Sequence, residues 1–173
     1  MGWNKVAIVG VGMIKFGELF EKGFENMMEE AYLAAINNVD KGFDPKEIQA
    51  AWLGTSRPNL FGFVTIGGAF VSGNLGLIGI PVTRVENGCP TGSDAFRNAC
   101  FGVASGVYDV VLAIGVEKMR DKSTSEGLLA RAVEGHPIIN RGETAAVTFS
   151  LVATRHMHEF GTTREQLAEV AVA

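Results

Sequence analysis

The sequence has few of the residues that build metal centres, disulfide frameworks or nucleic-acid surfaces. Its 173 residues include two cysteines and three histidines, and no group of them has metal-ligand spacing. The formal net charge is −4 without a basic stripe, which argues against a nucleic-acid surface. The chain contains neither a Walker loop nor a G-x-S-x-G nucleophile elbow. What remains is a chain that is 47% hydrophobic and long enough for a substantial core.

Neither a disulfide nor a membrane span is expected. If Cys89 and Cys100 lie along one continuous helix, their Cα atoms are about 16 Å apart, far beyond bridging distance. Reduced cysteines fit a cytoplasmic setting, and the first twenty residues show no secretory signal. The least charged stretch, Pro58–Pro81, is interrupted by six glycines and is too broken to span a membrane. We therefore expect a cytoplasmic protein.

Apolar runs without alternation predict strands that are covered on both faces, as in a parallel sheet. The expected strands are Val6–Val9, Ala50–Leu53, Val82–Val85 and Asp109–Val116. Helical spacing of apolar residues predicts helices over 24–35, 65–75, 96–104 and 145–160, with a short helix at 44–47 and a last one after the capping residues Thr162 and Thr163. The glycines after the first strand do not have the G-x-G-x-x-G spacing of a dinucleotide site, so we interpret them as a glycine turn.

Residues 120–143 form a long polar connection, of a length that is usual for lids, binding loops and insertions. We therefore divide the chain into a core, residues 1–119, and a second part, residues 120–173. The last predicted helix runs to Ala173 without a C-cap glycine or a closing strand. This predicts that the chain is a fragment or that another polypeptide completes it.

The segment Pro81–Ala104 contains the parts of an activated nucleophile. A β-branched strand leads into a turn bracketed by Gly88 and Gly92, and Cys89 sits just before a helix whose first turn suits Pro90. Free backbone N–H groups and the helix dipole at that point favour thiolate over thiol. Cysteine is also often a buried small hydrophobe, and no partner base lies nearby in sequence. Spacing alone leaves both interpretations open.

The histidines are weaker candidates. His156 and His158 are two residues apart, so on a helix they point about 200° apart and do not share a metal ion. Solvated or capping roles suit them better. His136 lies in the long connection, where a histidine could act as a base.

Four segments together resemble the thiolase family, and the nearest branch is that of the archaeal and sterol-carrier-protein-type (lipid-transfer) thiolases. They are residues 79–96 around Glu-Asn-Gly-Cys-Pro-Thr-Gly-Ser, 9–17, 109–119 and 155–167, in the family's order. The resemblance covers nearly the whole chain. It implies a layered α/β fold with a mixed, mostly parallel sheet and helices on both faces, of which this chain is about one half. Residues 1–119 would then be the N-terminal thiolase-like core, and 120–173 the start of the loop domain.

The resemblance also implies an acyltransferase of lipid metabolism in which Cys89 is the catalytic nucleophile. Cys89 would accept the acyl group of a 3-oxoacyl-CoA in thiolytic cleavage, or act in the reverse Claisen condensation. Coenzyme A is then a cosubstrate, and neither a tightly bound cofactor nor a metal is expected. Members of the family are dimers or tetramers, and some members of this branch associate with a small zinc-ribbon and OB-fold partner.

Departures from the family pattern leave substrate identity open. Gly88, Pro90 and Thr91 stand where Ala, Ala and Ser are commoner, which keeps the sulfur in place but changes its surroundings.

Two alternatives remain beside the thiolase hypothesis. One is a retro-aldolase-like relative of the lipid-transfer branch in which Cys89 is dispensable, and the other is a non-catalytic subunit that binds acyl-CoA.

We predict that the 173 residues alone do not catalyse thiolysis. The family's Asn-Glu, Gly-His-Pro and second-cysteine motifs, which supply proton transfer, are not at their expected places, and His136-Pro137 occurs in the loop region. Consumption of a 3-oxoacyl-CoA by the purified polypeptide in the presence of coenzyme A is the measurement. Robust turnover would contradict the prediction.

Overall fold

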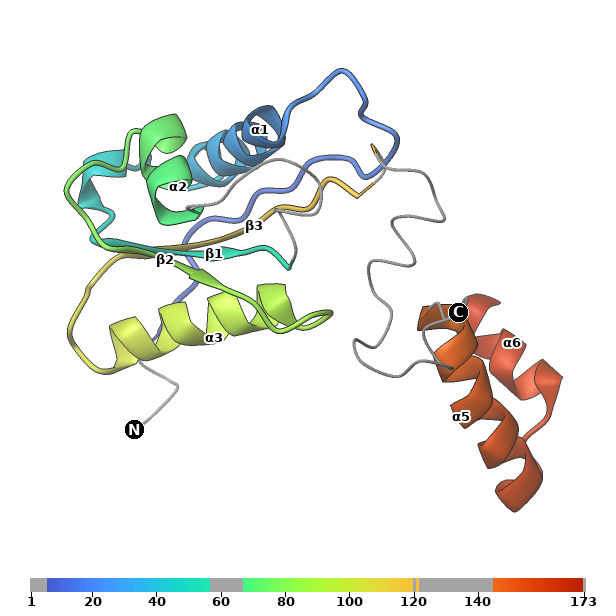
Figure 1. Cartoon of the computed structure of the whole chain (residues 1–173). Helices are drawn as coiled ribbons and strands as arrows, with labels where there is room; N and C mark the ends of the chain where they lie inside the picture. Colours follow the sequence, from blue (N-terminus) through green and yellow to red (C-terminus); the bar gives the residue numbers. More distant parts are fainter. Residues whose placement is uncertain (1–5, 57–66, 120, 122–144, 173) are drawn as a thin grey trace. The chain divides into compact units, whose positions relative to one another are not determined.

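A computed structural model describes residues 6–56, 67–119, 121 and 145–172 (Figure 1). The chain divides into two compact units, Met1–Asp121 and Lys122–Ala173, which are considered separately. The connection at 120–143 lies outside the described residues apart from Asp121.

A three-stranded parallel sheet forms the centre of the first unit. Its strands are β1 (Ala50–Gly54), β2 (Val82–Val85) and β3 (Val111–Gly115), in the order β2-β1-β3. Ala51 of the central strand stands opposite Val82 on one side and Leu112 on the other. Four of the five residues of β1 are buried, which explains an apolar run without alternation. Three of the four predicted strands are thereby confirmed.

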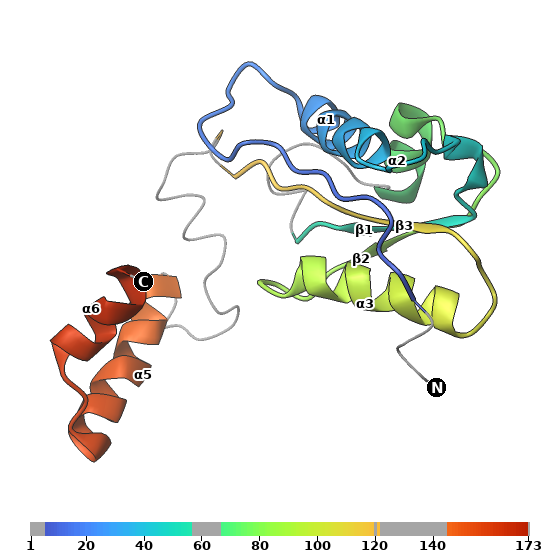
Figure 2. The same ribbon diagram turned by 180° about the vertical axis from the view of Figure 1, so that it is seen from behind.

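Helices cover both faces of this sheet. The helices α1 (Phe24–Asn37) and α2 (Gly67–Leu75) lie over one face, and α3 (Thr91–Ala104) lies over the other (Figures 1 and 2). A single 3-10 turn, η2 (Pro45–Glu47), leads into β1, and the Asp44 carboxylate accepts its capping hydrogen bond from the Lys46 N–H at 3.0 Å. The α/β class and the placement of helices on both faces are confirmed.

The two faces of the sheet are packed differently. Under α1 and α2, large side chains fill the core, with Leu53 and Met28 fully buried and Phe24 in edge contact with Phe70. On the α3 side the helix approaches closely through small residues. A Cβ at Gly102 would come within 2.9 Å of the Trp52 ring, so glycine is needed there. This close approach fixes α3 against β1.

The prediction of a buried strand at Val6–Val9 is wrong. The segment runs beside β3 (Figures 1 and 2), but within the described part of the chain no backbone hydrogen bond joins it to the sheet. The side chains of Ile8 and Val9 are 65% and 62% exposed. The glycines that follow explain the path, because the Cα atoms of Gly10 and Gly12 lie against the backbone of α1. The apolar run predicted both burial and pairing, and Ile8 and Val9 show neither in the described structure.

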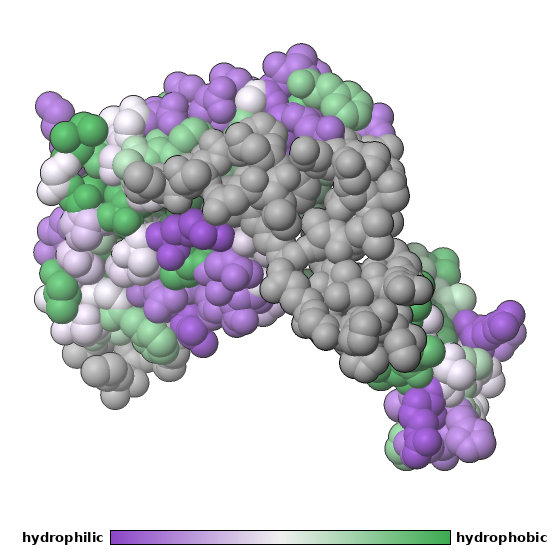
Figure 3. Space-filling view, in the orientation of Figure 1, coloured by the Kyte–Doolittle hydropathy of each residue, from purple (hydrophilic) through white to green (hydrophobic). Residues whose placement is uncertain are grey.

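The second unit contains the helices α5 (Ala145–Phe160) and α6 (Arg164–Val172). Thr163 and Gln166 form one of the two expected capping boxes: the Thr163 N–H donates to Gln166 Oε1 at 2.9 Å, and the Gln166 N–H donates to Thr163 Oγ1 at 3.3 Å. Apolar residues of this unit stand at its surface (Figure 3), among them Phe149, which is 67% exposed. None of the helices described is long and apolar enough to cross a membrane.

Replacing Leu53 with alanine tests the central strand. Leu53 is fully buried, so Leu53→Ala is expected to lower the free energy of unfolding by about 2 to 5 kcal/mol. Leu33→Ala on α1 is the control, because Leu33 is 47% exposed and its truncation leaves little cavity. Chemical denaturation measures both. Equal losses for the two variants would contradict the burial of β1.

Candidate active site

The carboxyl ends of the three parallel strands meet at one edge of the sheet, and Cys89 lies at this edge. Strand β2 ends at Val85, residues 86–90 turn, and α3 begins at Thr91. Cys89 is exposed in this turn, whereas Cys100 is buried on α3, and both thiols are free. The structure therefore places the two cysteines in opposite environments, Cys89 exposed in the turn before α3 and Cys100 buried on the helix.

The turn is closed by hydrogen bonds to its own backbone. The Thr91 hydroxyl donates to the Gly88 carbonyl at 2.6 Å and accepts from the Asn87 N–H at 2.8 Å. The Thr91 N–H also donates to the Gly88 carbonyl at 3.2 Å. Gly88 has φ +58°, a conformation that side chains with a Cβ rarely adopt. The residue before the cysteine is thus held in a conformation that requires glycine.

The first turn of α3 begins two residues after Cys89 and offers backbone donors. Pro90 is the N-cap residue, and no side chain caps the helix. The first N–H groups of a helix have no carbonyl partner within it, and they lie at the positive end of its dipole. Backbone N–H groups of this kind can stabilise the oxyanion that develops when a thiolate attacks a carbonyl. A Cβ built on Gly92 meets no atom within 4 Å, so this turn is open on that side.

Strand β1 supports the turn from beneath. A Cβ at Gly54 would lie 3.1 Å from the Thr91 carbonyl oxygen and 3.3 Å from the Gly92 Cα. The end of β1 therefore touches the first turn of α3 directly. Because glycine allows this approach, the start of the helix is fixed over the end of the central strand.

A polar network joins the ends of all three strands near the turn. The Glu117 carboxylate, after β3, accepts hydrogen bonds from the Ser56 N–H and from the Thr55 hydroxyl. Arg84 of β2 donates to the Thr55 carbonyl at 3.1 Å and to the Ser56 carbonyl at 2.9 Å. Glu86 accepts from the Ser56 hydroxyl at 3.3 Å and from the Gly88 N–H at 2.7 Å.

The sequence analysis did not identify this network. Its signal is the position of charged residues at the carboxyl ends of apolar strands, as in Arg84 and Glu117. That signal does not say which side chains meet, because the contacts join residues that are 28 to 62 positions apart.

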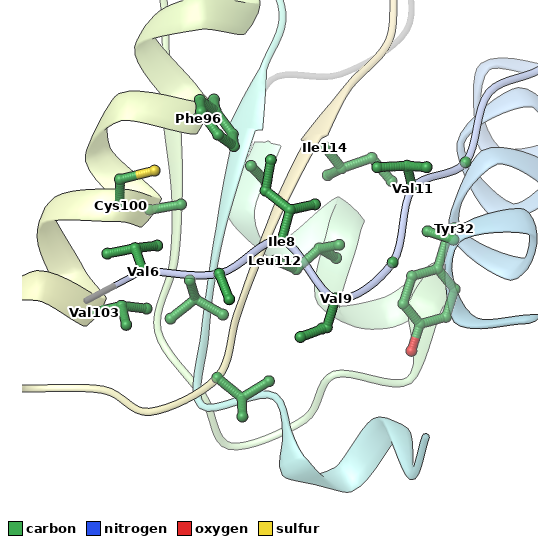
Figure 4. Close-up of a pocket in the computed structure, with 18 of the residues that line it drawn as sticks. Val6, Ile8, Val9, Val11, Tyr32, Phe96, Cys100, Val103, Leu112 and Ile114 are labelled. Atoms are coloured by element: carbon green, nitrogen blue, oxygen red, sulfur yellow. The ribbon is translucent and has the colours of Figure 1, made fainter. Parts of the chain in front are cut away.

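A separate apolar cavity of about 520 Å³ lies between the segment at 6–12, α1, α3 and β3 (Figure 4). Phe96 and Cys100 of α3 line it, and Cys89 does not. Within the described residues the Tyr32 hydroxyl at its wall has no hydrogen-bond partner, and burial raises the pKa of this phenol above its ordinary value. The cavity therefore does not form the surroundings of the candidate nucleophile.

His156 and His158 belong to the second unit, on α5. The His156 Nδ1 lies 2.8 Å from the Thr162 hydroxyl, a contact between two side chains. No group of three or more metal-ligating side chains is found among residues 6–56, 67–119, 121 and 145–172. His136 lies outside the described residues.

The chain is an α/β protein with a parallel sheet. It carries an exposed cysteine, a candidate nucleophile, just before a helix. Comparison with known proteins makes this class specific. The family described as "Thiolase, N-terminal domain" matches residues 6–173. The chain belongs to the thiolase family.

Curated relatives agree with this assignment. The chain is 40% identical to an acetyl-CoA acetyltransferase of Methanothermobacter thermautotrophicus, over 96% of this chain and 43% of the relative. It is 37% identical to an acetyl-CoA acetyltransferase of Methanocaldococcus jannaschii, over 94% and 41% respectively. It is 32% identical to sterol carrier protein 2 of Gallus gallus, over 97% and 32%. The chain thus spans less than half the length of these relatives. The predicted resemblance to archaeal and sterol-carrier-protein-type members of the family is confirmed.

Two alanine substitutions in the turn test its geometry. Gly88→Ala places a Cβ at φ +58° and is expected to lower the free energy of unfolding by about 1 kcal/mol. Gly92→Ala is the matched control, since it adds the same methyl group to a helical residue with open space, and alanine is the better helix former by about 1 kcal/mol. Chemical denaturation is the measurement. A neutral Gly88→Ala would show that the turn adopts another conformation.

Proposed function

We propose that the protein containing this chain is a thiolase-type acyltransferase acting on coenzyme A thioesters, with Cys89 as the residue that carries the acyl group. The observation that carries the proposal is the exposed Cys89 thiol directly before the first turn of α3. Membership of the thiolase family and the names of the archaeal relatives support the same reaction class.

The proposed reaction proceeds in two acyl transfers. The Cys89 sulfur, as thiolate, attacks the C3 carbonyl of a 3-oxoacyl-CoA, and the backbone N–H groups at the start of α3 face the developing oxyanion. The C2–C3 bond then breaks, so the acyl group stays on sulfur and the acetyl-CoA carbanion takes a proton from a general acid. Coenzyme A attacks the acyl-cysteine next, releases the shortened acyl-CoA and returns the Cys89 thiolate. Claisen condensation is the reverse sequence.

The resemblance places the proton-transfer groups in motifs that this sequence does not show at the expected positions. The proposal therefore assigns the nucleophile to this chain and leaves the acid and base to the family's later motifs. Coenzyme A is proposed as a cosubstrate, without an assignment of the residues that bind it. The dimer or tetramer, the zinc-ribbon and OB-fold partner and the cytoplasmic location stay predictions.

Substituting the two cysteines separately tests the proposal. In the protein containing this chain, Cys89→Ala is expected to abolish thiolysis because no acyl-enzyme can form. Cys100→Ala is the matched control: it removes the buried thiol of α3 and is expected to leave turnover within about twofold, with some loss of stability. Substoichiometric iodoacetamide at neutral pH is expected to label Cys89 and spare Cys100, as mapped by peptide mass spectrometry.

Other outcomes would favour the alternatives. Turnover that survives Cys89→Ala would contradict the proposal and favour a retro-aldolase-like relative of the lipid-transfer branch. An unreactive Cys89 with no turnover on any acyl-CoA would favour a non-catalytic acyl-CoA-binding subunit.

A further inference from the structure

Ser56 makes a hydrogen bond to each of three charged side chains at the edge of the sheet. Its N–H donates to the Glu117 carboxylate, its carbonyl accepts from Arg84 at 2.9 Å, and its hydroxyl donates to Glu86 at 3.3 Å. Two of these contacts are to its backbone, so they fix the residue whatever its side chain is. The hydroxyl is then presented to Glu86 from a fixed position.

Glu86 links this fixed point to the nucleophile turn. Its Oε1 atom accepts both the Ser56 hydroxyl and, at 2.7 Å, the N–H of Gly88, the residue directly before Cys89. The Gly88 carbonyl is held separately by Thr91. Both polar groups of the Gly88 backbone are therefore restrained, one from the end of β1 and one from the start of α3.

We propose that Glu86 is a positioning residue for Cys89, and that Ser56, held by Arg84 and Glu117, keeps Glu86 in place. The proposal rests on the proposed function, in which Cys89 attacks an acyl carbonyl. Restraint of the Gly88 backbone fixes where the Cys89 sulfur stands relative to the N–H groups of α3. Acyl transfer needs this alignment, because small misplacements of a nucleophile slow an oriented reaction severely.

The role depends on an oxygen acceptor and not on the negative charge of Glu86. A glutamine at position 86 keeps an oxygen that can accept both hydrogen bonds, whereas an alanine keeps none. A charge effect on the sulfur would change equally in both variants. Rescue by glutamine therefore separates positioning from electrostatics.

The experiment compares Glu86→Ala and Glu86→Gln in the protein containing this chain, with Glu29→Ala as the control. Glu29 is exposed on α1, on the face of the sheet opposite α3. The readouts are kcat and KM for thiolysis and the rate at which acyl-Cys89 forms from acetyl-CoA in a single turnover. Glu86→Ala is expected to lower kcat and the acylation rate about tenfold, as for a lost hydrogen bond to a charged group, and Glu86→Gln to restore both within about threefold.

Alkylation by iodoacetamide separates positioning from loss of structure. This small reagent needs no fixed geometry, so the labelling rate of Cys89 is expected to change less than about twofold in Glu86→Ala. Partial unfolding would instead expose Cys100 to the label. Appearance of label on Cys100 in Glu86→Ala, or a kcat in Glu86→Gln as low as in Glu86→Ala, would overturn the proposal.

A double-mutant cycle tests the part assigned to Ser56. Ser56→Ala removes only the hydroxyl that contacts Glu86 and keeps both backbone contacts. It is expected to lower acylation in the same direction, and the double variant is expected to be no slower than Glu86→Ala alone, because both changes break one chain of contacts. Additive losses would overturn this part of the proposal.

The outcomes for the inference and for the proposed function are distinct. If Cys89→Ala retains turnover and no acyl-Cys89 forms in the unsubstituted protein, the proposed function fails. If acyl-Cys89 forms normally and Glu86→Ala forms it at the unsubstituted rate, only the positioning role fails.

Discussion

The contact between Gly54 and the first turn of α3 is the constraint on which the site depends. The central strand ends at Gly54, where a Cβ would make tight contacts of 3.1 Å with the Thr91 carbonyl oxygen and 3.3 Å with the Gly92 Cα, so the helix start lies directly against the strand. Because β1 is buried on both faces, its end is a rigid support. The position of Cys89 therefore depends first on the buried strand β1 and then on the hydrogen bonds within the exposed turn.

This arrangement brings a polar network to the edge of the sheet at which the three strands end. Parallel strands place their carboxyl ends together, and the chain leaves each of them through residues that carry polar side chains or free backbone groups. Arg84 and Glu117 satisfy the backbone of residues 55 and 56, where the ladder ends. An unpaired backbone group in this half-buried place would lower the stability by about 1 to 3 kcal/mol. Arg84 and Glu117 therefore have a structural role that does not depend on catalysis.

The sequence predicted those parts of the fold that depend on local pattern. The strands at 50–54, 82–85 and 111–115 and the helices around Phe24 and Thr91 follow from burial on one or two faces, which periodicity reports. The segment at Val6–Val9 has the same pattern, yet Ile8 and Val9 are exposed and the segment is not paired, because burial and pairing depend on packing with distant parts of the chain that no local pattern encodes. Cys89 could be predicted because glycine, cysteine and proline are adjacent in the turn. Ser56 and Glu117 could not, because they meet across 61 residues.

The two cysteines show why position, and not residue type, carries the chemistry. Cys100 lies on the buried face of α3 among apolar neighbours, where a thiol behaves as a small hydrophobe. Cys89, eleven residues earlier, is exposed in the turn that precedes this helix, whose first N–H groups have no carbonyl partner within the helix. Attack on a thioester carbonyl requires only a presented sulfur and donors for the oxyanion, whereas cleavage of a carbon–carbon bond also requires a proton for the carbanion. The proposed function assigns the first requirement to Cys89 and the start of α3. Protonation of the carbanion is a separate requirement. The nucleophile and the proton donor can therefore lie on different parts of a thiolase.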